Sequence, residues 1–407
     1  MKNDQILDVT KDVKWIGILD YDIRKFDIVM NTEFGTTYNS YFINSEKKAI
    51  IETSKEKFKD EYLQKIIQIT NPADIEYIIL NHTEPDHSGN LKHLLKIAPK
   101  AKVVGSGNAI RYLKDMIEKP FESIQVKDGD ELDLGNKTLR FISAPNLHWP
   151  DSTYAYLVED KLLFTCDSFG AHFCHEEMFD DKVGNYDESF KYYFDVILKP
   201  FSKFMLKAIE KIKNLEISAI CPGHGPILQN DWKKYVNWSE ELAKNYLASS
   251  QSSKKRVLIA YVSAYGFTRE MAEQIAIGIQ EVSDAEIEIA DIEEMEMGEI
   301  DSKLTLCNAL IIGSPTINQN ILLPTYKMFA LINPIRDNGK LAASFGSYGW
   351  SGEGVKIIDS ALKSLKLEVP FDGISIKFKS NSTDIKRLIE FGKQFGEKLN
   401  SSDSCNS

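Results

Sequence analysis

Four potential metal ligands lie within six residues of one loop: His82, Glu84, Asp86 and His87. The loop directly follows the apolar run 77–80, which predicts a buried strand. Pro85 stiffens this loop and Gly89 permits a tight exit from it. Loops at strand ends are common places for sites in α/β proteins. The spacing therefore favours metal binding over the alternative, a polar loop whose histidines only cap a helix.

Three later fragments each place one further donor just after a predicted strand. His148 follows the strand at 138–143, Asp167 follows the strand at 162–165, and the strand at 217–220 precedes His224. Glycine or proline flanks the donor in each fragment. Four strand-end segments with donors of this kind need a common centre, so the seven side chains predict one metal site.

The order HxExDH, followed at long intervals by His, Asp and His, resembles the metallo-β-lactamase superfamily. Glu84 stands where hydrolases of that superfamily usually carry a histidine. Four imidazoles and three carboxylates with no thiolate suit iron better than zinc. Seven ligands around two metals leave open positions, as catalysis requires. The resemblance implies two groups, with Asp167 as the bridge: His82, Glu84 and His148 on one iron, and Asp86, His87 and His224 on the other.

Other candidate ligands are weaker. Cys166 adjoins Asp167, but strand alternation points its side chain the opposite way, which favours core packing. His93 lies on a predicted helix that leads away from the cluster, which favours a surface or packing role. His172 and His175 follow Asp167, and one of them could line the pocket, although a surface role is equally plausible for His175.

A second site is predicted after the apolar strand 257–262. The loop that follows begins and ends with a hydroxyl and opens a helix, so its backbone N–H groups can form an anion cradle. It lacks the GK[ST] ending of a P-loop and the GxGxxG of a dinucleotide fold, which favours a monophosphate. The loop comprises Ser263, Ala264, Tyr265, Gly266, Phe267 and Thr268.

Two more strand-end loops support this site. Loops at the carboxyl ends of neighbouring parallel strands form the ligand crevice of a doubly wound fold. Tyr348 or Trp350 offers an aromatic face for stacking on a flat ring. The arrangement resembles flavodoxin, which implies FMN, with its phosphate on 263–268 and its ring between loops that include Pro315, Thr316, Ile317 and Asn318, and Ser347, Tyr348, Gly349 and Trp350.

The elements that position these sites divide the chain in two. The serine-rich stretch 250–256 reads as a linker between residues 1–249 and 257–400. The first part mixes strands and helices, among them a long helix at 192–215, and suggests two sheets with helices outside, the αββα sandwich that the superfamily resemblance implies. In the second part, strands alternate with helices, and a strand is expected at 367–369, which predicts a flavodoxin-like doubly wound parallel sheet. The fold class is α/β.

The composition of the chain disfavours several classes of partner and location. The net charge of the 407 residues is −11, which disfavours a nucleic-acid or anionic-membrane partner. No apolar run approaches the ~20 residues that span a bilayer, and the amino terminus lacks a signal-like stretch, so we expect a cytoplasmic location. Five scattered cysteines without a CxxC pair indicate neither a disulfide framework nor a thiolate zinc site.

A lactamase-like domain with an iron-type ligand set, joined to a flavodoxin-like domain, resembles the flavodiiron proteins, also called A-type flavoproteins. The resemblance implies two non-haem irons and FMN in each chain, and reduction of O2 to water, of NO to N2O, or both. It also implies electrons from an external donor, either rubredoxin or reduced deazaflavin F420. The expected assembly is a head-to-tail homodimer or a dimer of dimers.

The resemblance also indicates pocket residues and one departure. His172 and Tyr193 are the candidates for the catalytic pocket lining. Many members carry a histidine near the irons where this chain has Asp27. Two alternatives stay open: a zinc-dependent hydrolase with a fused flavodoxin domain, and a flavin electron carrier without catalysis.

Overall fold

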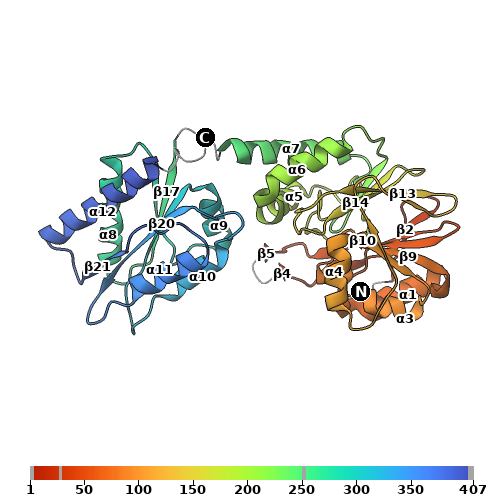
Figure 1. The fold of residues 1–407 in the computed structure, drawn as a ribbon, viewed down its shortest axis with the longest axis horizontal. Helices are drawn as coiled ribbons and strands as arrows, with labels where there is room; N and C mark the ends of the chain where they lie inside the picture. The colour runs from red at the N-terminus through yellow and green to blue at the C-terminus, as the bar shows by residue number, and fades with distance from the viewer. Residues whose placement is uncertain (1–3, 27–29, 250–253, 402–407) are drawn as a thin grey trace. The chain divides into compact units, whose positions relative to one another are not determined.

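A computed structural model describes residues 4–26, 30–249 and 254–401. The chain separates into two compact units between Leu247 and Ala248 (Figure 1). The linker at 250–256 stays a prediction, because residues 250–253 lie outside the described part. Asp27 also lies outside it. In the described residues, no helix is long and apolar enough to cross a membrane.

Two main sheets form the N-terminal unit. The seven-stranded sheet has the order β1-β2-β7-β8-β9-β10-β11 and mixes antiparallel with parallel pairs. It consists of β1 (Leu7–Asp8), β2 (Val13–Trp15), β7 (Tyr41–Ile43), β8 (Lys48–Ile51), β9 (Ile75–Ile79), β10 (Lys102–Ser106) and β11 (Ser123–Val126). The five-stranded sheet runs in chain order through β12 (Glu131–Asp133), β13 (Thr138–Ser143), β14 (Thr153–Leu157), β15 (Leu162–Cys166) and β16 (Ala219–Pro222).

Two short hairpin-like pairs complete the strands of this unit: β3 (Ile18–Asp20) with β6 (Thr36–Tyr38), and β4 (Lys25–Phe26) with β5 (Met30–Asn31). Its helices are α1 (Lys59–Ile69), α2 (Pro85–Ser88), α3 (Leu91–Ile97), α4 (Gly107–Met116), α5 (Asp187–Tyr193), α6 (Ser202–Ile212) and α7 (Trp232–Ser249). Strand alternation explains how the layers pack. On β9, Ile79 joins a core with Phe141 and Phe164 of the other sheet, whereas Ile78 packs with Ile66 of α1. Helices therefore cover the sandwich from outside, as predicted.

The predicted helix at 192–215 is interrupted. A π-helical turn, Phe194–Leu198, and a 3-10 turn, Lys199–Phe201, separate α5 from α6. Pro200 lies in the second turn and has no N–H to continue a helical ladder, which gives a physical reason for the break. Tyr193 ends α5 at this irregular segment.

In the C-terminal unit, one parallel sheet has the order β18-β17-β19-β20-β21. Its strands are β17 (Arg256–Tyr261), β18 (Glu286–Asp291), β19 (Ala309–Gly313), β20 (Leu341–Tyr348) and β21 (Ile374–Lys377). The order corresponds to 2-1-3-4-5 along the chain, the flavodoxin-like order. The fifth strand lies later than the predicted 367–369, where Glu368 makes only an isolated bridge with Leu341.

Helices cover both faces of the parallel sheet (Figure 1). On one face lie α8 (Phe267–Gln280) and α12 (Ser382–Ser401), and on the other lie α9 (Met297–Leu306), α10 (Leu323–Leu331) and α11 (Gly354–Ser364). Gly278 lets α8 approach α12 closely, because a Cβ there would lie 2.0 Å from the carbonyl oxygen of Ile389. The predicted fold class, two sheets with helices outside followed by a doubly wound parallel sheet, is confirmed.

Candidate metal centre and flavin site

The seven predicted metal ligands all follow strand ends of the N-terminal unit. The first four come after β9, and the short helix α2 buries Asp86 and His87 at the centre. His148 follows β13, Asp167 follows β15 directly, and His224 follows β16. The structure therefore gathers donors from segments that lie far apart in the sequence.

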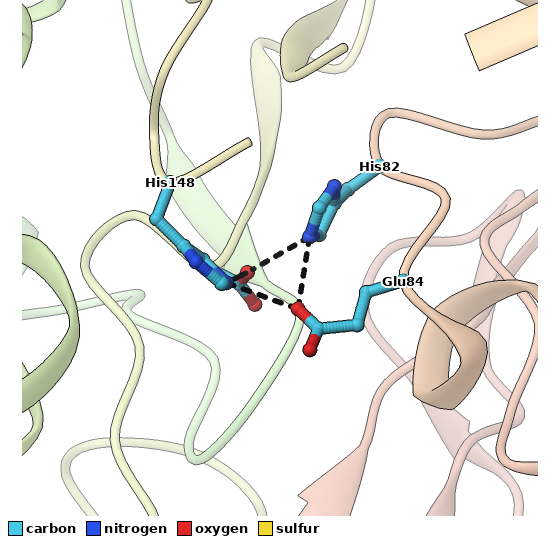
Figure 2. Close-up of side chains that lie close together, drawn as sticks. His82, Glu84 and His148 are labelled. Carbon is cyan, nitrogen blue, oxygen red and sulfur yellow. Dashed lines mark hydrogen bonds and ion pairs between the residues drawn. The ribbon is translucent and has the colours of Figure 1, made fainter. Parts of the chain in front are cut away.

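One group consists of His82, Glu84, His148 and Asp167. The Nε2 atoms of His82 and His148 lie 3.2 and 3.0 Å from Oε2 of Glu84. Oδ2 of Asp167 lies 3.3 Å from Nε2 of His148 and 3.6 Å from Nε2 of His82. Figure 2 shows the side chains of His82, Glu84 and His148 converging on one point. All these atoms can therefore face one cation.

A second group consists of Asp86, His87 and His224. Oδ2 of Asp86 lies 3.1 Å from Nε2 of His224 and 3.6 Å from Nε2 of His87. The other oxygen of Asp167, Oδ1, lies 3.1 Å from Nε2 of His87 and 3.6 Å from Nε2 of His224. Each Asp167 oxygen thus faces one group, which is the geometry that a bridging carboxylate needs.

The electrostatics of these buried donors favour a bound cation. Burial opposes a charge on His82, His87 and His148, yet the surrounding carboxylates raise the pKa of each imidazole to about 10. Burial would raise the pKa of Asp167, but His87, His148 and His82 hold it well below its ordinary value. Oδ1 of Asp86 is buried without a hydrogen-bond partner among the described residues. Anionic oxygen and imidazole donors of this kind fit two iron ions.

Outer hydrogen bonds fix the direction of two histidine rings. Nδ1 of His82 faces the carboxylate of Asp151, which also accepts hydrogen bonds from the backbone N and Oγ1 of Thr83 at 2.8 and 2.7 Å. Nδ1 of His224 lies 2.5 Å from the carbonyl oxygen of Thr37. These partners leave each Nε2 directed at the centre. The sequence prediction assigned Asp151 no role, because an acidic residue three positions after His148 can equally be an outer partner or a capping residue.

The weaker candidate ligands lie at different distances from the centre. Sγ of Cys166 lies 3.6 Å from Nδ1 of His87 and 4.0 Å from Oδ1 of Asp167, so the thiol contacts two predicted ligands rather than the core alone. His93 pairs with Glu56 at 2.8 Å. His175 accepts from the backbone N of Glu177 at 3.1 Å.

Beside the second group lie the two predicted pocket residues. The ring of His172 lies 4.8 Å from that of Tyr193 and 5.3 Å from that of His224, measured between centroids. Nδ1 of His172 lies 2.9 Å from Oγ1 of Thr36, whereas its buried Nε2 has no hydrogen-bond partner among the described residues. Burial and the nearby His224 hold the pKa of His172 well below its usual value, so the ring is neutral.

The three predicted flavin loops follow the neighbouring strands β17, β19 and β20. Gly266 has a φ of +81° at the start of α8, a conformation that glycine adopts freely, and Ser263 Oγ accepts from the backbone N of Arg269 at 3.3 Å. Oγ1 of Thr268 lies 2.9 Å from Oγ of Ser347, which links the first loop to the third. The second loop joins them where the backbone N of Thr316 donates to the carbonyl oxygen of Ser347 at 2.8 Å.

Two aromatic side chains of these loops are exposed to solvent. Tyr265 is 81% exposed and Trp350 is 76% exposed. Large exposed aromatic groups beside a polar cradle are available for stacking on a ligand ring. The remaining predicted positions, Ala264, Phe267, Pro315, Ile317, Asn318, Tyr348 and Gly349, lie in the same three loops or at their ends.

Comparisons with known proteins agree with both units. Residues 36–225 match the family described as ODP family beta lactamase, and residues 259–392 match the flavodoxin family. Over 396 residues the chain is 41% identical to the Flavo-diiron protein FprA2 of Clostridium acetobutylicum, which covers 94% of this chain and 97% of the relative. It is 36% identical to a type A flavoprotein of Rhodobacter capsulatus, over 96% of this chain and 91% of the relative.

Solved structures also resemble this chain over both units. The rubredoxin oxygen:oxidoreductase of Desulfovibrio gigas superposes with a TM-score of 0.74 at 26% identity, covering 98% of this chain and 99% of that one. The flavodiiron protein of Giardia intestinalis gives 0.69 at 29% identity, with 98% and 97% covered.

The chain belongs to the flavodiiron protein family. Flavodiiron proteins are oxidoreductases that carry FMN and a non-haem diiron site. The flavodoxin unit and the two donor groups of this chain fit those cofactors.

Proposed function

We propose that this protein reduces O2 to water, NO to N2O, or both, at a diiron centre held by the seven donors of the N-terminal unit. The observation that carries the proposal is the position of Asp167, whose two oxygens face separate donor groups. A carboxylate shared in this way would offset part of the mutual repulsion of two cations held by these groups. FMN on the three loops of the C-terminal unit is the proposed source of electrons for the centre.

When bound, the iron pair supplies electrons to a diatomic gas and FMN restores them. The chain's own residues shape the site around that chemistry. Asp151 and the carbonyl of Thr37 keep His82 and His224 directed inward. His172 and Tyr193 wall the second donor group with buried rings. A neutral His172 adds no positive charge beside the metal ligands, and its free Nε2 can hydrogen-bond to a small polar guest.

Electrons come from an external donor, rubredoxin or reduced deazaflavin F420. The name of the Desulfovibrio gigas protein, rubredoxin oxygen:oxidoreductase, links rubredoxin with oxygen and supports the first of these donors. We propose a cytoplasmic protein that binds neither nucleic acid nor membrane, consistent with the net charge of −11.

Cofactor analysis of anaerobically purified protein tests the function. Two irons and one FMN per chain, with O2 or NO consumption driven by reduced rubredoxin, are expected. Zinc in place of iron, with no consumption of either gas, would favour a metallo-β-lactamase-like hydrolase. FMN without iron would favour a flavin electron carrier.

The assembly is proposed to be a head-to-tail homodimer or a dimer of dimers, in which the flavin of one subunit faces the irons of the other. This rests on the family resemblance. Subunit exchange between a Thr268→Ala and an Asp167→Ala protein tests it, because each heterodimer then holds one intact flavin site and one intact donor set in facing subunits. Activity above the sum of the two variants is expected. Verified heterodimers without added activity would refute transfer between subunits.

A further inference from the structure

A buried glutamate lies directly after β8, in a backbone conformation that a glutamate rarely adopts. Glu52 has a φ of +59° and is 2% exposed. Left-handed backbone is unfavourable for a residue with a Cβ and persists where the surroundings impose it. Burying a carboxyl group at such a position is costly as well. Both costs indicate that this side chain has a specific role.

The segment that begins with Glu52 holds both ends of the metal-ligand loop. Oε1 of Glu52 accepts a hydrogen bond from the backbone N of Asn81 at 2.8 Å, one residue before His82. The backbone N and Oγ1 of Thr53 donate to the carbonyl oxygen of His87 at 2.8 and 2.6 Å. Residues 52 and 53 therefore fix the entrance of the loop and its last ligand.

The carboxylate of Glu52 also lies near the ring of that last ligand. Oε2 of Glu52 is buried and has no hydrogen-bond partner among the described residues. Glu52, His87 and Cys166 each contribute one donor atom to a cluster in which all three atoms lie within 4.8 Å of one another. Nε2 of His87 faces Asp167 at 3.1 Å, whereas its Nδ1 faces Sγ of Cys166 at 3.6 Å, a weak partner. The nearby carboxylate is the stronger acceptor.

We propose that Glu52 is a positioning residue for the second iron position: its carboxylate holds Asn81 at the loop entrance and, as the anionic group near the ring of His87, attracts Nδ1–H and so keeps Nε2 directed at Asp86 and Asp167. The inference rests on the proposed diiron function. It gives His87 a counterpart to the Asp151 that backs His82. Carboxylate partners behind ligating histidines orient the ring and increase its basicity. Glu52 touches neither gas nor metal in this role.

Glu52→Gln tests the proposal with ferrous-ion affinity, measured anaerobically by competition with a chelator. The amide keeps one oxygen for Asn81 but replaces the second acceptor with a donor. Affinity at one of the two iron positions should fall about 10- to 100-fold, so that chelation removes one iron first, while FMN content stays unchanged. Glu56→Gln is the matched control, since Glu56 is on the surface and pairs with Lys92 and His93, and it should leave both affinities unchanged.

The same substitution in a His87→Ala protein shows whether Glu52 acts by positioning His87 or only by supporting the loop. In His87→Ala protein, Glu52→Gln should cause no further loss of iron affinity, because the ring on which Glu52 acts is absent. An equal loss in both backgrounds would overturn the proposal and leave Glu52 as a support for Asn81. Unchanged iron affinity in the single variant would overturn it as well.

Glu52→Gly guards against misfolding, because glycine adopts the left-handed backbone freely. Iron-free Glu52→Gly protein should still melt in a cooperative transition, and it should bind the second iron with reduced affinity; iron bound with wild-type affinity would count against the proposal. Iron binding is measured without gas consumption. Normal iron binding without gas reduction would therefore contradict the proposed function and leave the result on Glu52 intact.

Discussion

Both carboxylate oxygens of Asp151 lie close to Nδ1 of His82, at 3.2 and 3.3 Å. The pair is fully buried, and the opposite ring nitrogen of His82 faces Glu84. Asp151 therefore acts on the metal centre through His82 and not by contact with a metal. An effect on iron affinity is expected without any change in the number of direct ligands.

Asp151→Asn should weaken iron binding at the position of His82 about 10- to 100-fold, because an amide is a poorer acceptor for Nδ1–H and no longer carries the charge that supports the ring. Chelator competition measures this affinity. The surface variant Asp133→Asn is the control, since Asp133 is exposed and pairs with Lys47 and the backbone N of Gly135, which are not metal ligands. Equal iron affinity in wild type and Asp151→Asn would show that His82 needs no outer partner.

Asp167→Ala should remove turnover and deplete iron while FMN stays bound. The carboxylate faces both donor groups, so its loss weakens both positions, whereas the flavin loops belong to another compact unit. Metal analysis and flavin absorbance of the same sample provide the measurement. A variant that kept two irons and consumed gas normally would disprove the bridging role.

Thr268→Ala should reduce FMN affinity by about one to two orders of magnitude, since a hydrogen bond to a charged phosphate contributes ~1.5 to 3 kcal/mol. Fluorescence titration of the flavin-free protein with FMN measures the change. Thr383→Ala, an exposed position in the first turn of α12, is the control. Donor-driven turnover should recover with excess FMN, and iron content should not change. Undiminished FMN affinity would place the phosphate elsewhere.

Lys65 predicts a pH dependence of stability that is independent of the cofactors. Its side chain is fully buried, donates to the carbonyl oxygen of Gly17, and lies 4.7 Å from the ring of Trp15. Burial lowers its pKa from 10.5 to about 7. Between these two values the unfolded chain binds more protons than the folded one, so this residue makes stability rise with pH from about 7 to about 10.

Comparison with Lys65→Met isolates the effect. From pH 7.5 to 9.5, the free energy of unfolding of wild type should gain about 2 kcal/mol relative to the variant. Denaturant unfolding of iron-free protein at both pH values provides the measurement. Loss of the hydrogen bond to Gly17 changes the free energy of unfolding of the variant equally at the two pH values, so it does not contribute to the difference between them. Parallel pH profiles would show that Lys65 is charged in the folded state.

The strand-end donors could be predicted because each carries local signals, a preceding apolar run and a flanking glycine or proline. The residues behind them could not be predicted in this way. Glu52 precedes its partner Asn81 by 29 positions, and only the pairing of β8 with β9 brings them together. Asp151 has polar neighbours in the sequence, and nothing local distinguishes an outer partner from a capping residue.

Some predicted element boundaries were wrong, because contacts in the folded chain outweigh the local sequence pattern. Pro200 interrupts an apolar pattern that otherwise continues through α5 and α6. Helix α9 was not anticipated, because only Ile300, Leu304 and Thr305 are buried in it and its apolar face is therefore narrow. Strand β17 lies within one residue of its predicted position, 257–262, because its apolar run is buried almost throughout.

Gas consumption by chemically prereduced, flavin-depleted protein tests the central claim most directly, because it separates the diiron centre from its electron supply. Thr268→Ala protein that has been dialysed free of FMN, loaded with iron and reduced should consume a limited amount of gas and then stop. Two ferrous ions hold two electrons, which is enough for about two NO per site to form N2O, or for about one O2 per two sites, because reduction of O2 to water needs four electrons. Asp167→Ala protein treated in the same way should consume none. Equal consumption by the two proteins, or none by the iron-loaded Thr268→Ala protein, would contradict reduction of the gas at the seven-donor site.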